Sequence, residues 1–216
     1  INNNNSDYIH DGLILHLDGI NIGNNYGYWT DQIGGRKFTI EGDVYHNIDR
    51  MIFNGGFCSK IVEDADRIDP TDVTIHVCFK CYSTSAQIWL FSFPPINPTD
   101  IPKNQVSTFF FLQNGNSVQF SRPKQIGYHI GDILTNNTCS VNSELGISNF
   151  ITLDYGHKEW WGGLNECSIG RRSSLYPVTF FGEIMNIMIY NRKLSKEEML
   201  HNQNIDNKRF NLRLEQ

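Results

Sequence analysis

The chain has 216 residues, of which 39% are hydrophobic and 12% aromatic, so it carries enough apolar side chains for one large packed core and does not resemble a disordered chain. The formal net charge is −5 and no lysine-rich run is present, which argues against a general nucleic-acid binder or an anionic-membrane binder. No apolar run approaches the ~20 residues that span a bilayer, and the scattered cysteines, odd in number, fit no disulfide scaffold.

The N-terminal region predicts a polar leader followed by a strand. Residues 1–7 include four consecutive asparagines and form the leader. In residues 13–18 three leucines alternate with residues that include His16 and Asp18, the period-two pattern of a strand with one apolar and one mixed face. Residues 19–27 are rich in Asn and Gly and predict a loop.

The middle of the chain predicts several short strands. The clearest pattern occupies 73–80, where four apolar residues alternate with residues that include His76 and Lys80. Prolines cluster between 94 and 102, which predicts an irregular surface loop. With no internal repeat, about a dozen short strands indicate two packed antiparallel sheets. Further strand patterns lie at 87–93, 107–113, 118–120 and 150–153.

In the strands predicted at 13–18 and 73–80, the polar residues fall on the faces opposite the apolar side chains. They are His16, Asp18, His76 and Lys80. If the strands are neighbours, these side chains form one polar patch, in which histidine and aspartate together could hold a metal ion. The favoured interpretation is a solvated sheet face with cross-strand pairs.

Residues 180–190 predict a strand that is buried on both faces, which is typical of a central strand in a covered sheet. Strict alternation places Phe181, Met185, Ile187 and Ile189 on one side and Phe180, Ile184, Met188 and Tyr190 on the other. Asn191 and Arg192 end the strand. Ser195 followed by Glu198 is the capping-box signature of a helix start, so we expect a short helix and then a tail over 205–216.

Two stretches resemble a known family. Residues 11–21 read DGLILHLDGIN, with Trp29 and Asp31 after the loop, and residues 181–198 read FGEIMNIMIYNRKLSKEE. Both resemble terminal signatures of laminin-G-like (concanavalin A-like lectin/glucanase) jelly-roll domains. The resemblance implies an all-β fold, a concanavalin A-like jelly-roll sandwich of two antiparallel sheets with a short C-terminal helix. It also implies a single domain over 1–216, with the first and last strands in one sheet system.

Sequence motifs for catalysis are missing. Glycoside hydrolases of this sandwich fold use an E-x-D-x-x-E strand, and the acidic residues at 63–66 do not form one. A Gly-x-Ser-x-Gly elbow, an HExxH pair and a phosphate-binding glycine loop are also absent. We therefore predict no catalytic residues.

The loop at 154–163 is the candidate ligand-binding site. Near its glycines it holds Tyr155, His157, Trp160 and Trp161. Aromatic rings offer flat surfaces to the C–H faces of sugars, and planar polar groups bond to hydroxyls. Adjacent tryptophans in an extended segment cannot both be buried on one face, so at least one is expected to be partly exposed. In the alternative interpretation, one tryptophan caps the sandwich and the other packs on a neighbouring loop.

No metal site and no cofactor are predicted, and calcium binding is left as an open alternative. Asp18, Asn21 and Asn24 offer oxygen ligands of the kind that relatives in this superfamily use for calcium, but no fixed-spacing motif supports a site. Cys78 and Cys81 have CxxC spacing. They point to opposite faces of their strand, and no second cysteine or histidine pair lies nearby in the sequence to complete a zinc site.

These features predict a non-catalytic recognition or adhesion module for a glycan or protein ligand, with glycan the favoured class, displayed on a cell surface, a secreted protein or a virion. We expect neither nucleic-acid binding nor membrane insertion. Because the chain does not begin with Met, we expect it to be part of a larger chain or assembly. Two alternatives stay open: a structural or assembly domain that binds protein subunits, as in a phage decoration or fibre domain, and a glycoside hydrolase or lyase of the same fold.

Overall fold

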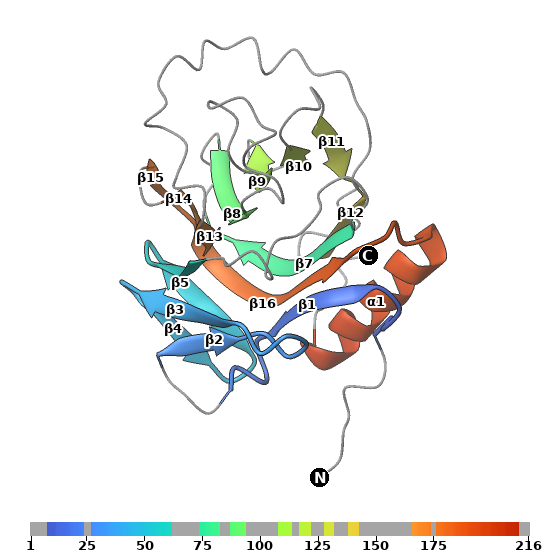
Figure 1. Ribbon diagram of the computed structural model, residues 1–216, viewed down its shortest axis with the longest axis horizontal. Helices are drawn as coiled ribbons and strands as arrows, with labels where there is room; N and C mark the ends of the chain where they lie inside the picture. Colours follow the sequence, from blue (N-terminus) through green and yellow to red (C-terminus); the bar gives the residue numbers. More distant parts are fainter. Residues whose placement is uncertain are drawn as a thin grey trace.

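Antiparallel strands dominate the described part of the computed structural model, where one helix follows the last strand (Figure 1). Within the described residues the strands are β1 to β16 and the helix is α1. They form a six-stranded sheet, an eight-stranded sheet and a small pair. This confirms the predicted all-β sandwich of two antiparallel sheets with a C-terminal helix. The structure describes residues 8–23, 27–61, 74–82, 87–93, 108–113, 117–121, 128–131, 138–142, 166–173 and 176–211.

The six-stranded sheet, here sheet A, has the order β12-β7-β16-β5-β4. Along one edge β16 pairs with β7, and along the other it pairs first with β5 and then with β1. The first and last strands therefore lie in one sheet with β16 at its centre, as predicted. The bounds are β1 (Leu13–Asp18), β4 (Val44–Asn47), β5 (Arg50–Asn54), β7 (Thr74–Cys81), β12 (Thr138–Asn142) and β16 (Phe181–Tyr190).

The eight-stranded sheet, here sheet B, has the order β11-β10-β9-β8-β13-β6-β3-β2. Its bounds are β2 (Tyr28–Thr30), β3 (Lys37–Glu41), β6 (Phe57–Ile61), β8 (Gln87–Phe93), β9 (Thr108–Gln113), β10 (Ser117–Ser121), β11 (Tyr128–Gly131) and β13 (Glu166–Ile169). The small pair joins β14 (Arg171–Ser173) to β15 (Tyr176–Thr179).

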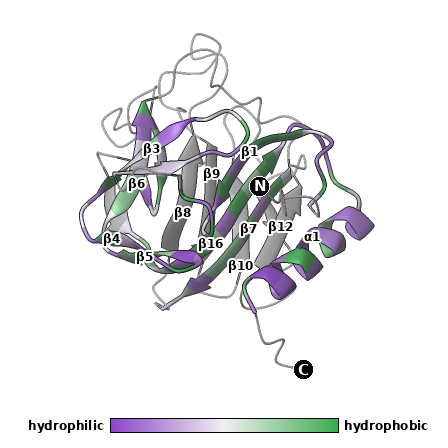
Figure 2. Cartoon of the chain, turned by 90° about the horizontal axis from the view of Figure 1, so that it is seen from below, coloured by the Kyte–Doolittle hydropathy of each residue, from purple (hydrophilic) through white to green (hydrophobic). Residues whose placement is uncertain are grey.

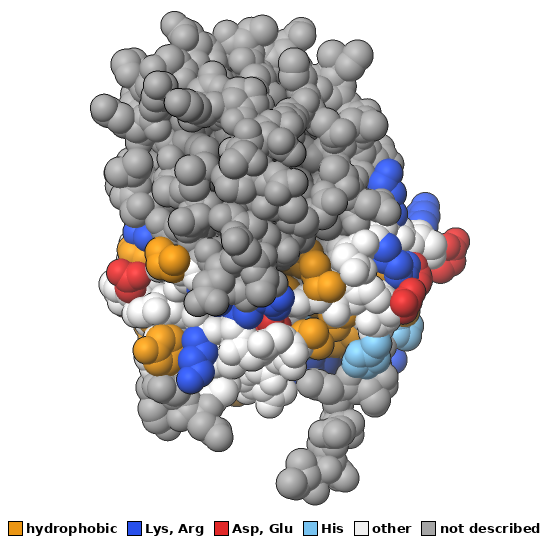
Figure 3. Space-filling model, viewed as in Figure 1, with side chains coloured by type: hydrophobic (Ala, Val, Ile, Leu, Met, Phe, Trp, Pro, Cys, Tyr) orange, Lys and Arg blue, Asp and Glu red, His pale blue; other side chains and the backbone are white. Residues whose placement is uncertain are grey.

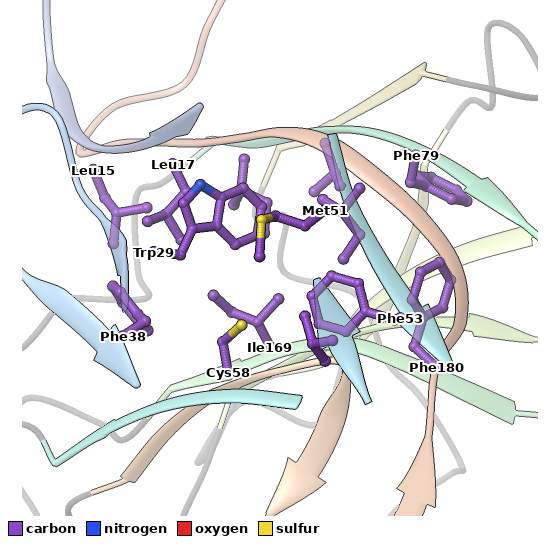
Figure 4. Close-up of a cluster of buried hydrophobic side chains, with 14 of the residues drawn as sticks. Leu15, Leu17, Trp29, Phe38, Met51, Phe53, Cys58, Phe79, Ile169 and Phe180 are labelled. Atoms are coloured by element: carbon purple, nitrogen blue, oxygen red, sulfur yellow. The ribbon is translucent and has the colours of Figure 1, made fainter. Parts of the chain in front are cut away.

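The main core lies between the two sheets (Figure 4). Sheet B contributes the fully buried ring of Trp29 and, next to it along the sheet, Phe38. Phe53 of sheet A packs edge-to-face on Phe180, with ring centroids 5.9 Å apart. Aromatic and aliphatic side chains from both sheets thus form one apolar layer, whose burial is the main term that holds the sandwich together.

A β-bulge in β16 changes which side chains face this core. Ile184 pairs with Phe79 and Asn186 with Cys78, so Met185 is an extra residue on its strand. Ile184 belongs to the core between the sheets, whereas Met185 packs on the other face of sheet A. The predicted grouping of Met185 with Ile187 and Ile189 is therefore wrong, because strict alternation assumes a strand without a bulge. The predicted grouping of Phe180 and Ile184 with Met188 and Tyr190 is wrong for the same reason.

Asp31 ties β1 to the start of sheet B. Its carboxylate is fully buried and accepts hydrogen bonds from the backbone N–H of His16 (2.8 Å), Ile33 (3.0 Å) and Gly34 (3.0 Å). The guanidinium of Arg36 also donates to it over 2.6 Å. One carboxylate thus satisfies four donors where the turn after β2 of sheet B meets β1 of sheet A.

The helix α1 (Lys196–Arg209) begins at the predicted capping box. Ser195 is the N-cap and accepts from the backbone N–H of Glu198, whose carboxylate accepts in return from the N–H of Ser195. The helix continues to Arg209, so the prediction of a tail from residue 205 is wrong for its first five positions. The reason is that the buried side of α1 is largely polar, and the sequence shows no apolar stripe there.

The figures show where α1 lies. In Figure 1 it lies on the opposite side of β7 and β16 from β8–β11, and in Figure 2 it runs along one side of sheet A, while β4 and β5 lie at the other. Among the described residues, no helix has the length and apolar character needed to cross a membrane.

Candidate functional site

The predicted ligand-binding residues Tyr155, His157, Trp160 and Trp161 lie outside the described residues, as does Asn24. Their assignment to a ligand site therefore stays a prediction. One set of described polar and charged side chains gathers on the face of sheet A that points away from sheet B, here called the outer face.

The outer face has two halves. One half lies under α1 and is called the covered half; its polar side chains come from β1, β7 and β16. The other is called the open half and is built on β4, β5 and the neighbouring ends of β7 and β16. The covered half holds His16, Asp18, His76 and Asn186, and the open half holds Tyr45, Arg50, Ile52, Lys80, Tyr82 and Glu183.

Asp206 of α1 lies at the centre of the covered half. Its Oδ2 lies 2.6 Å from Nε2 of His76, and its Oδ1 accepts from the amide of Asn186 over 3.0 Å. The hydroxyl of Tyr8 donates to the same Oδ1 over 2.5 Å. Burial and then the nearby Asp206 carboxylate raise the pKa of Tyr8, so this phenol keeps its proton and stays a donor.

A second carboxylate lies on β1. Asp18 accepts from Nη2 of Arg209 over 2.7 Å and from the amide of Asn21 over 2.9 Å, and its side chain is fully buried. His16 lies edge-on to Tyr8, with ring centroids 5.5 Å apart. Charges of both signs therefore meet under α1, each held by a partner rather than by water.

The prediction that these strands present a solvated polar face is wrong for three of its four residues. His16, Asp18 and His76 are buried, at 3%, 0% and 0% exposure. The cause is α1, which covers them with polar groups of its own. Lys80 lies beyond the helix and is exposed, as expected. Within the described residues, no group of three or more His, Cys, Asp or Glu side chains is placed to hold a metal ion.

We expect burial of His16 to make the fold sensitive to acid. Burial lowers the pKa of His16 from its usual 6.5, and the Asp18 carboxylate only partly offsets this. The unfolded chain then binds a proton at a pH where the folded chain does not, so stability falls as the pH drops below about 6.5 and levels off below the folded pKa. Urea unfolding at pH 7.5 and pH 5.0 is expected to show this loss.

His16→Gln is expected to reduce the difference between the two pH values, since glutamine does not titrate. Its matched control is His10→Gln, which removes an exposed imidazole and should leave the difference unchanged. If His16→Gln retains the full acid sensitivity of the unmodified chain, another group is responsible and the interpretation of His16 is wrong.

In the open half, a carboxylate is fixed between two donors. Glu183 accepts from the guanidinium of Arg50 and from the hydroxyl of Tyr82. Arg50 is held in turn by Asp49, to which its Nε and Nη2 donate over 2.6 and 3.1 Å. Partial burial and then the bond to Glu183 raise the pKa of Tyr82 to about 12, so its phenol is protonated at neutral pH.

The two halves differ in what they can bind. Side chains of the covered half contact one another and α1, so they serve to attach the helix. Tyr45 and Tyr82 in the open half are 48% and 54% exposed and can contact a ligand. The sequence could not single them out, because they come to lie on one sheet face only when β4 and β7 are joined through β5 and β16. In the view of Figure 3, which is that of Figure 1, acidic and basic side chains are interspersed over the described part of the molecular surface.

Comparisons with known proteins support the fold. No family model and no curated protein match the chain. Trypanosoma rangeli sialidase in complex with the inhibitor DANA matches 89% of the chain at 12% identity, with a TM-score of 0.56. The same sialidase in complex with 2,3-difluorosialic acid matches 90% at 14% identity, with a TM-score of 0.55. The chain spans 33% of the length of either sialidase chain. At these identities the similarity shows a shared β-sandwich fold.

Proposed function

We propose that the chain is a non-catalytic recognition module of the laminin-G-like, concanavalin A-like type that binds glycans. The observation that carries the proposal is the pairing of β1 with β16 inside a two-sheet sandwich, which is the arrangement that the family resemblance implies. The similarity in fold to part of a sialidase chain adds support. The module would be displayed on a cell surface, a secreted protein or a virion.

In this proposal the loop at 154–163 makes the main contact with sugar. Trp160, Trp161 and Tyr155 would stack on the C–H faces of sugar rings, and His157 would hydrogen-bond to hydroxyls. A site of this kind releases little free energy per sugar ring. We therefore expect weak binding at a single site and stronger binding when several copies of the module engage one glycan surface.

A glycan array tests this function. The unmodified chain, presented on beads in many copies, is expected to bind a subset of glycans, and Trp160→Ala and Trp161→Ala are expected to lower this signal about tenfold or more. Ile48→Ala is the control, because this side chain is 84% exposed and lies outside the loop. Circular dichroism spectra that match between variants would show that each one folds.

Three results would contradict the proposal. If the chain binds no glycan even when presented in many copies, it is not a glycan-recognition module. If the tryptophan variants bind as the unmodified chain does, the loop is not the site. Release of free sugar from a bound glycan would show that the chain is an enzyme and would favour a glycoside hydrolase or lyase of the same fold.

A further inference from the structure

A row of side chains crosses the open half from edge to centre. Register places Tyr45 of β4 opposite Ile52 of β5, and Ile52 opposite Glu183 of β16. Glu183 is in turn opposite Lys80 of β7. Residues directly opposite each other share a face of the sheet, and four strands spaced by about 4.8 Å give the row a length of about 14 Å. The row is therefore long enough for more than one sugar ring.

Exposed aromatic rings flank the row above an apolar floor. Tyr45 at one end of the row is 48% exposed and Tyr82, two residues beyond Lys80 at the other end, is 54% exposed, whereas Ile52 within the row is only 7% exposed. The ring of Tyr82 is held in place, because its hydroxyl donates to Glu183 and the ammonium group of Lys80 lies 5.9 Å from its centroid. A ring that is already fixed loses little conformational entropy when a ligand stacks on it.

The charges around the row cancel. Arg50 and Lys80 are positive, and Asp49 and Glu183 are negative. The Arg50 guanidinium is bonded to both carboxylates, so neither carboxylate is left to attract a cation and the guanidinium is not left to attract an anion. The hydrogen-bonding groups beside the row can bond to the hydroxyl groups of a ligand. The balance of charge favours a ligand with no net charge.

We propose that the open half is a second carbohydrate-contact surface, made of residues other than those at 154–163, which binds an internal stretch of a neutral polysaccharide. This proposal rests on the proposed function, from which it takes carbohydrate as the class of ligand. Because the row is open along the sheet face, a bound polysaccharide can extend past it in both directions. Such a surface can bind internal sugar units and does not require a chain end. Tyr45 and Tyr82 stack on sugar rings, while Lys80 and the edge of the Arg50–Glu183 pair bond to hydroxyls.

Affinity gel electrophoresis of the full chain tests this surface. The gels contain mixed-linkage β-glucan, xylan, galactomannan or amylose as neutral polysaccharides, and polygalacturonate as the acidic one. We expect retardation by at least one neutral polysaccharide and a dissociation constant about five- to tenfold higher in Tyr45→Ala and in Tyr82→Ala. Tyr82→Phe keeps the ring and is expected to bind within about twofold of the unmodified chain.

The chain offers a matched control in Tyr28→Ala. Tyr28 of β2 also has a lysine over its ring, with Nζ of Lys37 5.7 Å from the centroid, but it belongs to sheet B. Binding by this variant should not change. The surface is overturned if Tyr45→Ala and Tyr82→Ala migrate as the unmodified chain does, if polygalacturonate alone retards it, or if no polysaccharide does. The glycan array separates the two proposals, since array binding that depends on Trp160 and Trp161 would survive each of these results.

Discussion

Asp206→Ala is expected to lower the free energy of unfolding by about 3–5 kcal/mol, because it removes one partner from a fully buried charged network. Three side chains lose the acceptor that they share, namely Tyr8, His76 and Asn186. Urea unfolding followed by tryptophan fluorescence measures the loss.

Two further variants show whether the loss comes from this network. Asp206→Asn keeps one oxygen that can accept from Tyr8 or Asn186, so it is expected to lose about half as much as the alanine variant. Asn204→Ala changes an exposed residue of the same helix and should shift stability by less than about 0.5 kcal/mol. A loss below about 1 kcal/mol in Asp206→Ala would show that other contacts hold α1 in place.

Asp31→Ala is the second change with a large expected effect. It leaves the backbone N–H groups of His16, Ile33 and Gly34 and the guanidinium of Arg36 without their common acceptor. Buried donors without a partner each cost about 1–3 kcal/mol, and a charged donor costs more. We expect the midpoint of thermal unfolding, measured by calorimetry, to fall by about 10 °C.

Two controls accompany Asp31→Ala. Asp31→Asn retains one side-chain oxygen and should lose less, since it can still accept from the backbone of β1. Asp43→Ala removes an exposed carboxylate from a turn and should leave the midpoint nearly unchanged. If Asp31→Ala and Asp43→Ala unfold at the same temperature, the junction between the sheets does not depend on Asp31.

The sequence predicted the features that depend on strong local patterns. The leucines of β1 and the isoleucines of β16 alternate clearly enough to identify both strands, and the two family signatures predicted that these strands share a sheet. Ser195 and Glu198 predicted the helix start, because a capping box involves residues only three positions apart. Such features are visible in a few neighbouring residues.

The remaining features depend on residues that are distant in the sequence. Met185 faces away from the main core because of a bulge, and nothing in the alternating pattern marks one extra residue. Asn202 and Asp206 attach α1 through hydrogen bonds to Tyr190 and to His76, so the helix shows no apolar stripe by which its length could be predicted. The open half depends in the same way on the register of four strands.

The position of β16 at the centre of sheet A has a consequence for biosynthesis. On the ribosome β1, β5 and β7 emerge long before β16, the strand to which all three are hydrogen-bonded in the finished sheet. Until then their edges stay open to other chains, which favours misassembly and gives molecular chaperones a reason to bind. The Tyr8–Asp206 hydrogen bond joins residues 198 positions apart, so folding is expected to be slow and to finish only after α1 has left the ribosome.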